Sequence, residues 1–115
     1  MMSTIHIDGR SLTLEQIERV ATDLDTVVKL EFEARKRMKA SRDFIEAKVA
    51  SGEQVYGVTT GFGRLADVLI EPHERAALQL NLVRSHASGM GDPMVQPSVR
   101  ALMLLRANAL ARGYS

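Results

Sequence analysis

Apolar residues recur at helical spacing along most of the chain, and this pattern predicts a mainly α-helical protein. The longest predicted helix covers residues 31–51, with Gly52 as its expected stop. Its apolar positions are Ala34, Met38, Ile45 and Val49, with Ser41 in the gap between them. A shorter helix is predicted over residues 14–22, because Thr13 just before it and Gln16 in its first turn form a capping box.

Two short segments near the amino terminus have the character of β-strands instead. Residues 4–7 alternate polar and apolar side chains and lead into Asp8-Gly9, a dipeptide typical of hairpin turns. Residues 26–30 are rich in β-branched side chains. Two strands this short are marginal alone, so we expect them to pair with each other and to lean on the helices.

The second half of the chain predicts two more helices. Pro72 suits the first turn of one of them, and between Ala76 and Val83 only Gln79 and Asn81 are polar, so this helix is expected to be buried on most sides. Ser98 is the expected cap of the last helix. Its predicted apolar stripe is Val99, Leu102, Met103, Ala107 and Leu110, with Gly113 as the stop.

The amino-acid composition favours a helical fold class and gives no support for nucleic acid or a membrane as a partner. The chain has 115 residues and 45% hydrophobic residues, which fits one unit over residues 1–115, a helical bundle-like segment with a two-stranded β appendage. Aromatic residues make up 4%, so the core must consist of aliphatic side chains and Met. A net charge of +1 gives no reason to expect nucleic acid. Cysteine is absent and no apolar run is long enough to span a membrane.

The segment from Tyr56 to Gly63 is the first candidate for chemistry. It holds three glycines and two threonines between two helical segments, so it predicts an ordered loop. Its spacing matches neither the dinucleotide-binding fingerprint nor a P-loop. One interpretation is a tight structural connection. The other is a backbone that a ligand can approach, with Tyr56 presented to it as a general base.

The second candidate is the end of the helix near residue 86. His86 follows Ser85 and precedes a glycine-rich break, which is compatible with a ligand-facing histidine or with an ordinary helix-end histidine. His6, His73 and His86 have no metal-binding spacing, so no metal site is expected.

Together these segments resemble the aromatic amino-acid lyase family, and within it the histidine-type members. The matching stretches are residues 56–63 (YGVTTGFG), 78–83 (LQLNLV), 85–93 (SHASGMGDP) and 100–115 (RALMLLRANALARGYS). The resemblance implies a cytoplasmic, mainly helical homotetramer that eliminates ammonia from an aromatic amino acid without oxidation. For a histidine-type member, L-histidine is the implied substrate and urocanate the product.

The resemblance also implies roles for individual residues. Tyr56 stands at the position of the family's catalytic base. His86 stands where the family lines the pocket for the substrate side chain, and Ser85 and Gly63 are assigned to substrate binding with it.

The family's electrophile is methylidene-imidazolone, which forms from an internal Ala-Ser-Gly. Ala87-Ser88-Gly89 has that composition, but it follows Ser-His, whereas the family's precursor lies further downstream in a Gly-Ala-Ser-Gly-Asp-Leu context. We therefore expect the cofactor-forming and central bundle regions to lie outside this chain, which should be an inactive amino-terminal fragment. Two alternatives stay open: a fragment of a tyrosine ammonia-lyase or aminomutase, and a freestanding helical interaction module.

Overall fold

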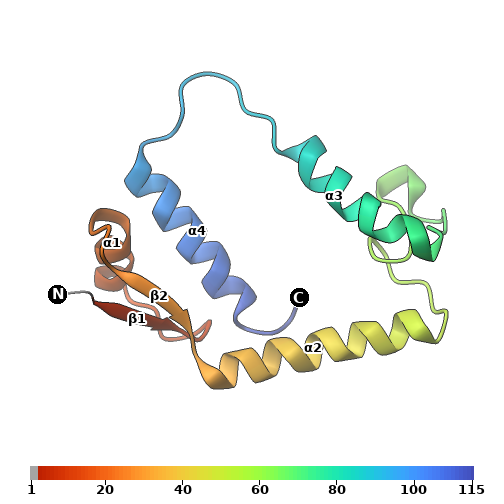
Figure 1. Cartoon of the computed structure of the whole chain (residues 1–115), viewed down its shortest axis with the longest axis horizontal. Helices are drawn as coiled ribbons and strands as arrows, with labels where there is room; N and C mark the ends of the chain where they lie inside the picture. Colours follow the sequence, from red (N-terminus) through yellow and green to blue (C-terminus); the bar gives the residue numbers. More distant parts are fainter. Residues whose placement is uncertain (1–2) are drawn as a thin grey trace. The chain divides into compact units, whose positions relative to one another are not determined.

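The computed structural model describes residues 3–115 and is mainly helical, as predicted. Its helices and strands follow one another along the chain in the order shown in Figure 1. They are β1 (Thr4–Ile7), α1 (Leu14–Thr22), β2 (Val27–Leu30), α2 (Phe32–Ala50), the 3-10 turns η1 (Gly63–Leu65) and η2 (Pro72–Glu74), α3 (Arg75–His86) and α4 (Gln96–Leu110).

The chain divides into two compact units. Unit 1 comprises the described residues up to Asp43 together with Pro93–Ser115, and unit 2 comprises Phe44–Asp92. The single unit expected from the sequence stays a prediction, and each compact part is described here by itself.

Unit 1 is built on two parallel strands with helices packed on them. Ile5 of β1 lies opposite Val28 of β2, and Ile7 lies opposite Leu30. Parallel neighbours need a crossover, which α1 supplies, so the turn predicted after β1 at Asp8-Gly9 leads into α1 and is not of the hairpin type. The Asp8 carboxylate instead accepts the amide protons of Arg10 (2.7 Å) and Ser11 (2.8 Å) and guides the chain toward α1.

The core of unit 1 lies where α1 and α4 pack together over the sheet (Figure 1). Its buried members are Ile5, Ile7, Val20 and Leu104, with Leu12, Ile17 and Leu30 packed against them. The predicted capping box at the start of α1 is confirmed, since Thr13 Oγ1 accepts from the Gln16 amide and Gln16 Oε1 accepts from the Thr13 amide.

The predicted apolar stripe of α4 is wrong in its orientation. Val99, Leu102 and Met103 are exposed, whereas Leu104 is buried. The reason is that the inward face of α4 also carries polar side chains that bond to other backbone. Arg100 Nε donates to the Val20 carbonyl at 2.6 Å, and Asn108 Oδ1 accepts from the Gly9 amide at 2.9 Å.

The start of α4 also differs from the prediction. The helix begins at Gln96 with Val95 as its N-cap, and Ser98 lies inside the first turn rather than capping it. Pro97 occupies the first turn, where its fixed φ angle and missing amide proton are tolerated.

The periodicity of α2 is confirmed in outline. Ala34 is buried, and Met38, Ser41, Ile45 and Val49 are half-buried along one side. The helix ends at Ala50, and Gly52 takes the left-handed conformation with φ of 78°.

In contrast, α3 has no buried residue in this structure. Leu80 is 50% exposed and Val83 is 65% exposed. The described residues therefore do not bury this helix as the sequence predicted.

Candidate functional site

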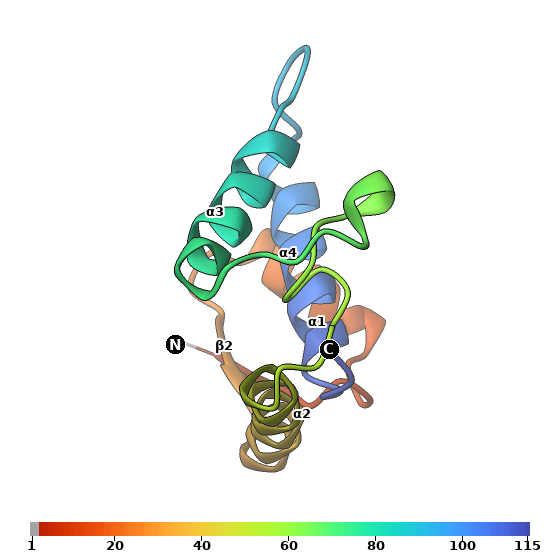
Figure 2. The same cartoon turned by 90° about the vertical axis from the view of Figure 1, so that its right-hand side faces the viewer.

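The candidate site lies in unit 2, in the loop between α2 and α3, coloured yellow-green to green in Figure 2. The loop begins next to a surface ion pair in which Lys48 Nζ lies 2.9 Å from Glu53 Oε1. The hydrogen bond from Lys48 lowers the pKa of the Glu53 carboxyl, and the positive charge of the same ammonium adds to this effect. This ion pair therefore joins the last turn of α2 to the first residues of the loop.

Two threonines form the interior of this loop. Thr59 and Thr60 are each only 2% exposed. Thr59 Oγ1 accepts from the Val55 amide at 2.8 Å, and the Thr59 amide donates to the Val55 carbonyl at 2.9 Å. Because buried polar groups are costly without partners, these bonds select one loop conformation.

Thr60 holds the other side of the turn. Its Oγ1 accepts from the Gly57 amide at 3.2 Å and donates to the Gly61 carbonyl at 3.1 Å. An isolated antiparallel β-bridge pairs Thr60 with Leu69 and joins the loop to the segment that precedes α3. An ordered loop, as predicted from the sequence, is confirmed.

Gly57 is needed in this loop for two reasons. Its φ of 70° is a left-handed conformation that side chains disfavour, and a Cβ added here would lie 2.7 Å from Cε1 of Phe62. The Phe62 ring thus occupies the space that any larger residue would need.

Tyr56 is presented at the surface rather than buried in a core. The residue is 63% exposed, and its phenol oxygen accepts the Gly63 amide proton at 3.2 Å. Phe62 packs against it edge to face, with ring centroids 5.8 Å apart and an interplanar angle of 80°. Two neighbours therefore orient the ring while leaving the phenol accessible.

Gln79 connects this loop to α3. Its Nε2 donates to the Gly57 carbonyl at 2.9 Å across 22 residues of chain. The sequence alone indicated no role for Gln79, although an amide side chain on a largely apolar helix was a signal that could have marked it. Thr59, Thr60 and Phe62 were likewise not singled out, because their contacts depend on how the loop folds back on itself.

Ser85 and His86 form the second half of the site, at the end of α3. His86 Nδ1 lies 2.9 Å from the Leu82 carbonyl and 3.1 Å from Ser85 Oγ, and Ser85 Oγ donates to the same carbonyl at 2.9 Å. Two lone pairs do not approach this closely, so Nδ1 carries a proton and donates it to Leu82. In the neutral ring this leaves Nε2 as a hydrogen-bond acceptor.

The structure thus brings the predicted residues together in two pairs, Tyr56 with Gly63 and Ser85 with His86. No described hydrogen bond in residues 3–115 joins one pair directly to the other. Gln79 provides the polar link between the loop and the helix that carries the second pair.

Ala87-Ser88-Gly89 lies in an open part of the chain. The Ala87 amide donates to the Val83 carbonyl as the C-cap of α3, and residues 87–92 are exposed. A Cβ added to Gly89 would meet no atom within 4 Å.

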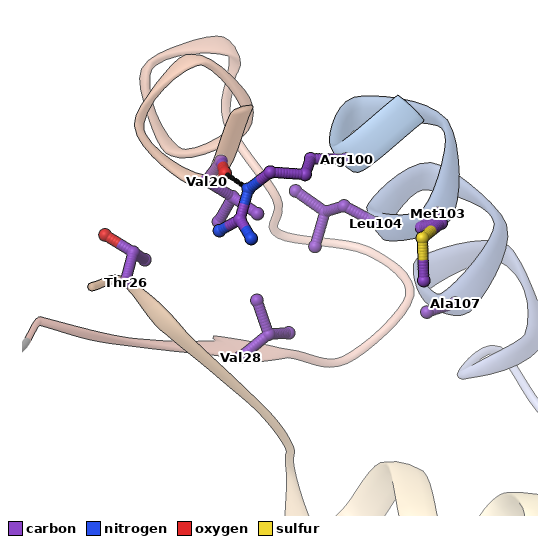
Figure 3. Close-up of a pocket in the computed structure, with 7 residues that line it drawn as sticks. All are labelled: Val20, Thr26, Val28, Arg100, Met103, Leu104 and Ala107. Atoms are coloured by element: carbon purple, nitrogen blue, oxygen red, sulfur yellow. Dashed lines mark hydrogen bonds between the residues drawn. The ribbon is translucent and has the colours of Figure 1, made fainter. Parts of the chain in front are cut away.

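Unit 1 contains a separate, apolar cavity of about 280 Å³ between β2, α1 and α4 (Figure 3). Its lining residues are Val20, Thr26, Val28, Arg100, Met103, Leu104 and Ala107. The only charged group among them, Arg100, is committed to backbone carbonyls, so the cavity offers no acid–base pair. Across residues 3–115, no group of three or more histidine or acidic side chains gathers in a way that could hold a metal ion. None of the helices in that range combines the length and apolar character needed to cross a membrane.

The sequence profile of the aromatic amino acid lyases matches residues 12–115. The chain belongs to the aromatic amino acid lyase family. A histidine ammonia-lyase of Caldanaerobacter subterraneus subsp. tengcongensis is 47% identical over 114 residues, covering 99% of this chain and 22% of that protein. The chain therefore spans about a fifth of the length of the curated relatives that it matches.

Solved structures of the family share the fold of this segment. A tyrosine aminomutase from Streptomyces globisporus matches with a TM-score of 0.86 and 34% identity, covering 96% of this chain and 21% of its own. A histidine ammonia-lyase from Trypanosoma cruzi matches with a TM-score of 0.85 and 34% identity over the same shares.

Proposed function

We propose that this chain is the amino-terminal segment of an enzyme that eliminates ammonia from L-histidine and yields urocanate. Membership of the family supports the reaction class, and the similarity to histidine ammonia-lyases over nearly the whole chain supports the substrate. The observation that carries the proposal is the exposed Tyr56 phenol, held by Gly63 and Phe62 in an ordered loop.

In this proposal, Tyr56 removes the β-proton of the substrate. A general base must reach the proton it abstracts at hydrogen-bonding distance, which requires an accessible and fixed oxygen. The phenol oxygen meets both conditions, because it is exposed and its direction is set by the Gly63 amide. Gly63 then acts on the substrate through Tyr56.

His86 recognises the side chain of the substrate in this proposal. With Nδ1 committed to the Leu82 carbonyl, Nε2 is the acceptor for an N–H of the substrate's imidazole. Ser85 is compatible with this tautomer, since its hydroxyl proton is donated to the Leu82 carbonyl and its oxygen, 3.1 Å from Nδ1, can accept from the protonated ring nitrogen. The pair would therefore bind a ring that carries a hydrogen-bond donor.

The electrophile, methylidene-imidazolone, would be formed by protein outside these residues. Once formed, that group would supply an electron sink that makes the β-proton acidic enough to remove. Ala87-Ser88-Gly89 does not fit as its precursor, because it follows Ser-His at the exposed end of α3 and lacks the Gly-Ala-Ser-Gly-Asp-Leu context of the family's precursor. We accordingly propose that residues 3–115 contribute a base and a pocket wall, and that they are inactive alone.

The test compares this chain with a full-length enzyme that carries it. L-histidine is supplied to each, and the absorbance of urocanate is followed. We expect turnover by the full-length enzyme and none by the isolated chain, and a large fall in turnover, to a low residual rate, in full-length Tyr56→Phe. Turnover by the isolated chain, or full activity of Tyr56→Phe, would contradict the proposal.

A second candidate is a tyrosine-specific lyase or aminomutase. The acceptor nitrogen of His86 suits a phenol hydroxyl as well as an imidazole N–H, and one structural neighbour is a tyrosine aminomutase. Supplying L-tyrosine to the same enzyme separates the two, because an aminomutase would return β-tyrosine and a lyase a cinnamate-type acid.

The assembly of the full-length enzyme is also a proposal. A cytoplasmic homotetramer follows from the family resemblance, and the exposed apolar residues of α3 give it physical support as surface that needs a partner. Light scattering on the full-length enzyme tests the tetramer. A freestanding interaction module would instead be indicated if residues 3–115 bound a partner protein and no lyase activity accompanied any longer form.

A further inference from the structure

The Tyr56 loop is held to α3 by a contact that the proposed reaction does not explain. The two peptide units that flank Gly57 are both engaged. The Gly57 amide, which belongs to the peptide bond following Tyr56, donates to Thr60 Oγ1 at 3.2 Å, and the Gly57 carbonyl accepts from Gln79 Nε2 at 2.9 Å. The backbone next to the phenol-bearing residue is therefore clamped from inside the loop and from α3.

Gln79 is exposed to solvent, which is unusual for a side chain that holds a loop in place. A glutamine on an exposed helix face ordinarily remains free in water, because ordering its long side chain costs conformational entropy. Here the amide is committed to one carbonyl, and its neighbours Leu78 and Leu80 are apolar. Because α3 is already held by its own backbone hydrogen bonds, a contact across 22 residues constrains the loop more than the helix.

The same helix carries the other half of the site. Gln79 and His86 are seven residues apart on α3, which places them on the same side of the helix, separated by roughly 10 Å along its axis. A loop docked at Gln79 and an imidazole fixed at His86 then share one rigid support. Loss of the dock would leave the imidazole in place and release the phenol.

We propose that Gln79 is a positioning residue that sets the place of the Tyr56 phenol relative to His86. This inference rests on the function proposed above, because it assumes that Tyr56 is the base. Gln79 touches no reacting atom, and it acts through the Gly57 carbonyl and the peptide attached to Tyr56. A displaced base lowers the rate of proton removal more than it weakens substrate binding.

The first test uses three variants of the full-length enzyme. Gln79→Glu preserves the shape but replaces the donor by a carboxylate that repels the Gly57 carbonyl, and Gln79→Lys restores a donor. Gln96→Glu makes the same amide-to-carboxylate change at an exposed position of unit 1 and serves as the control. We expect Gln79→Glu to lower kcat on the order of 100-fold with little change in KM, Gln79→Lys to recover most of the loss, and the control to be unaffected.

Amide exchange distinguishes displacement of the loop from unfolding. In Gln79→Glu, peptides covering residues 55–60 should exchange faster, while those covering α3 should exchange at the parental rate. Loss of protection throughout α3 would mean that Gln79 supports the helix as a whole, and this would overturn the positioning role.

The decisive measurement is a double-mutant cycle with Tyr56→Phe. If Gln79 acts through the phenol, Gln79→Glu should cause no further loss of the residual rate that the Tyr56→Phe enzyme retains. An equal further loss would overturn the inference. A strongly impaired Tyr56→Phe enzyme beside a fully active Gln79→Glu enzyme would also overturn it, while leaving the proposed function intact. A fully active Tyr56→Phe enzyme would instead remove the catalytic assignment itself, and the inference with it.

Discussion

Arg100 of α4 donates from Nε to the carbonyl of Val20 in α1 at 2.6 Å, as Figure 3 shows. Its Nη2 donates to the Asp23 carbonyl at 3.2 Å. Carbonyls at the end of a helix lack partners within the helix. One guanidinium thus satisfies the end of α1 and joins it to α4, which lies 80 residues later in the chain.

Replacing Arg100 by methionine should destabilise unit 1. The Arg100→Met side chain keeps its apolar stem but leaves the Val20 carbonyl without this donor, so the free energy of unfolding should fall by about 1–3 kcal/mol. Chemical denaturation followed by circular dichroism measures the change. Arg106→Met, at an exposed position of the same helix, is the matched control and should leave stability nearly unchanged. Equal effects of the two variants would contradict the capping role.

Gly57→Ala should disturb the Tyr56 loop strongly. The added methyl group would sit 2.7 Å from the Phe62 ring at a φ of 70°, so either the ring or the turn must move. The left-handed conformation alone costs about 1–2 kcal/mol for a residue with a side chain.

Near-ultraviolet circular dichroism, to which the tyrosines contribute in this tryptophan-free chain, should report the loss of order around Tyr56. Gly89→Ala is the control, because a Cβ there meets no atom within 4 Å. An unchanged spectrum in Gly57→Ala would show that the contact with Phe62 does not hold the loop.

Asp8 should make stability depend on pH in the acid range. Amide protons from Ser11 and Arg10 and the Ser11 hydroxyl lower the pKa of the Asp8 carboxyl from 3.8 to about 2. A carboxyl with a lowered pKa in the folded state stabilises the fold fully above the unfolded value, and this contribution disappears as the pH falls through the folded value.

Asp8→Ala should therefore be less stable than the parent chain above pH 3.8, and this difference should shrink between pH 3.8 and about 2. Denaturation midpoints measured across this range test the expectation. A difference that stayed constant down to pH 2 would indicate that the charge of Asp8 contributes nothing.

The exposed apolar face of α3 should make the isolated chain bind a hydrophobic dye. Leu80, Val83 and the nearby Met90 are 50%, 65% and 99% exposed, which is unusual for large apolar side chains close together on one segment. The double variant Leu80→Gln with Val83→Gln should reduce dye fluorescence and any self-association seen by sedimentation. A monomeric parent chain that does not bind the dye would contradict the idea that α3 needs a partner.

Local signals were sufficient for much of the fold. The capping box of Thr13 and Gln16, the period of α2 and the left-handed stop at Gly52 each depend on residues within a few positions of one another, so the sequence predicted them correctly. The ordered loop around Tyr56 belongs to this group as well, because its glycine and threonine content left few alternatives.

Contacts between distant residues account for the errors. The orientation of α4 was predicted wrongly because Arg100 and Asn108 face inward, toward carbonyl and amide groups about 80 to 100 residues away, and periodicity counts such residues as solvent-facing. Asp8-Gly9 was assigned a hairpin type of turn because a dipeptide by itself does not reveal whether the chain next enters a strand or a helix.

In the candidate site, too, some features could be predicted from the sequence and others only from the structure. Residue types and their order along the chain were enough to indicate the family and to mark Tyr56, Gly63, Ser85 and His86. The hydrogen bonds that orient the loop, from the Gly63 amide to the phenol and from Gln79 to the Gly57 carbonyl, could be seen only in the folded chain. A hydrogen bond depends on distance and angle between atoms, and for residues separated by a loop those quantities are set by packing rather than by the order of residues.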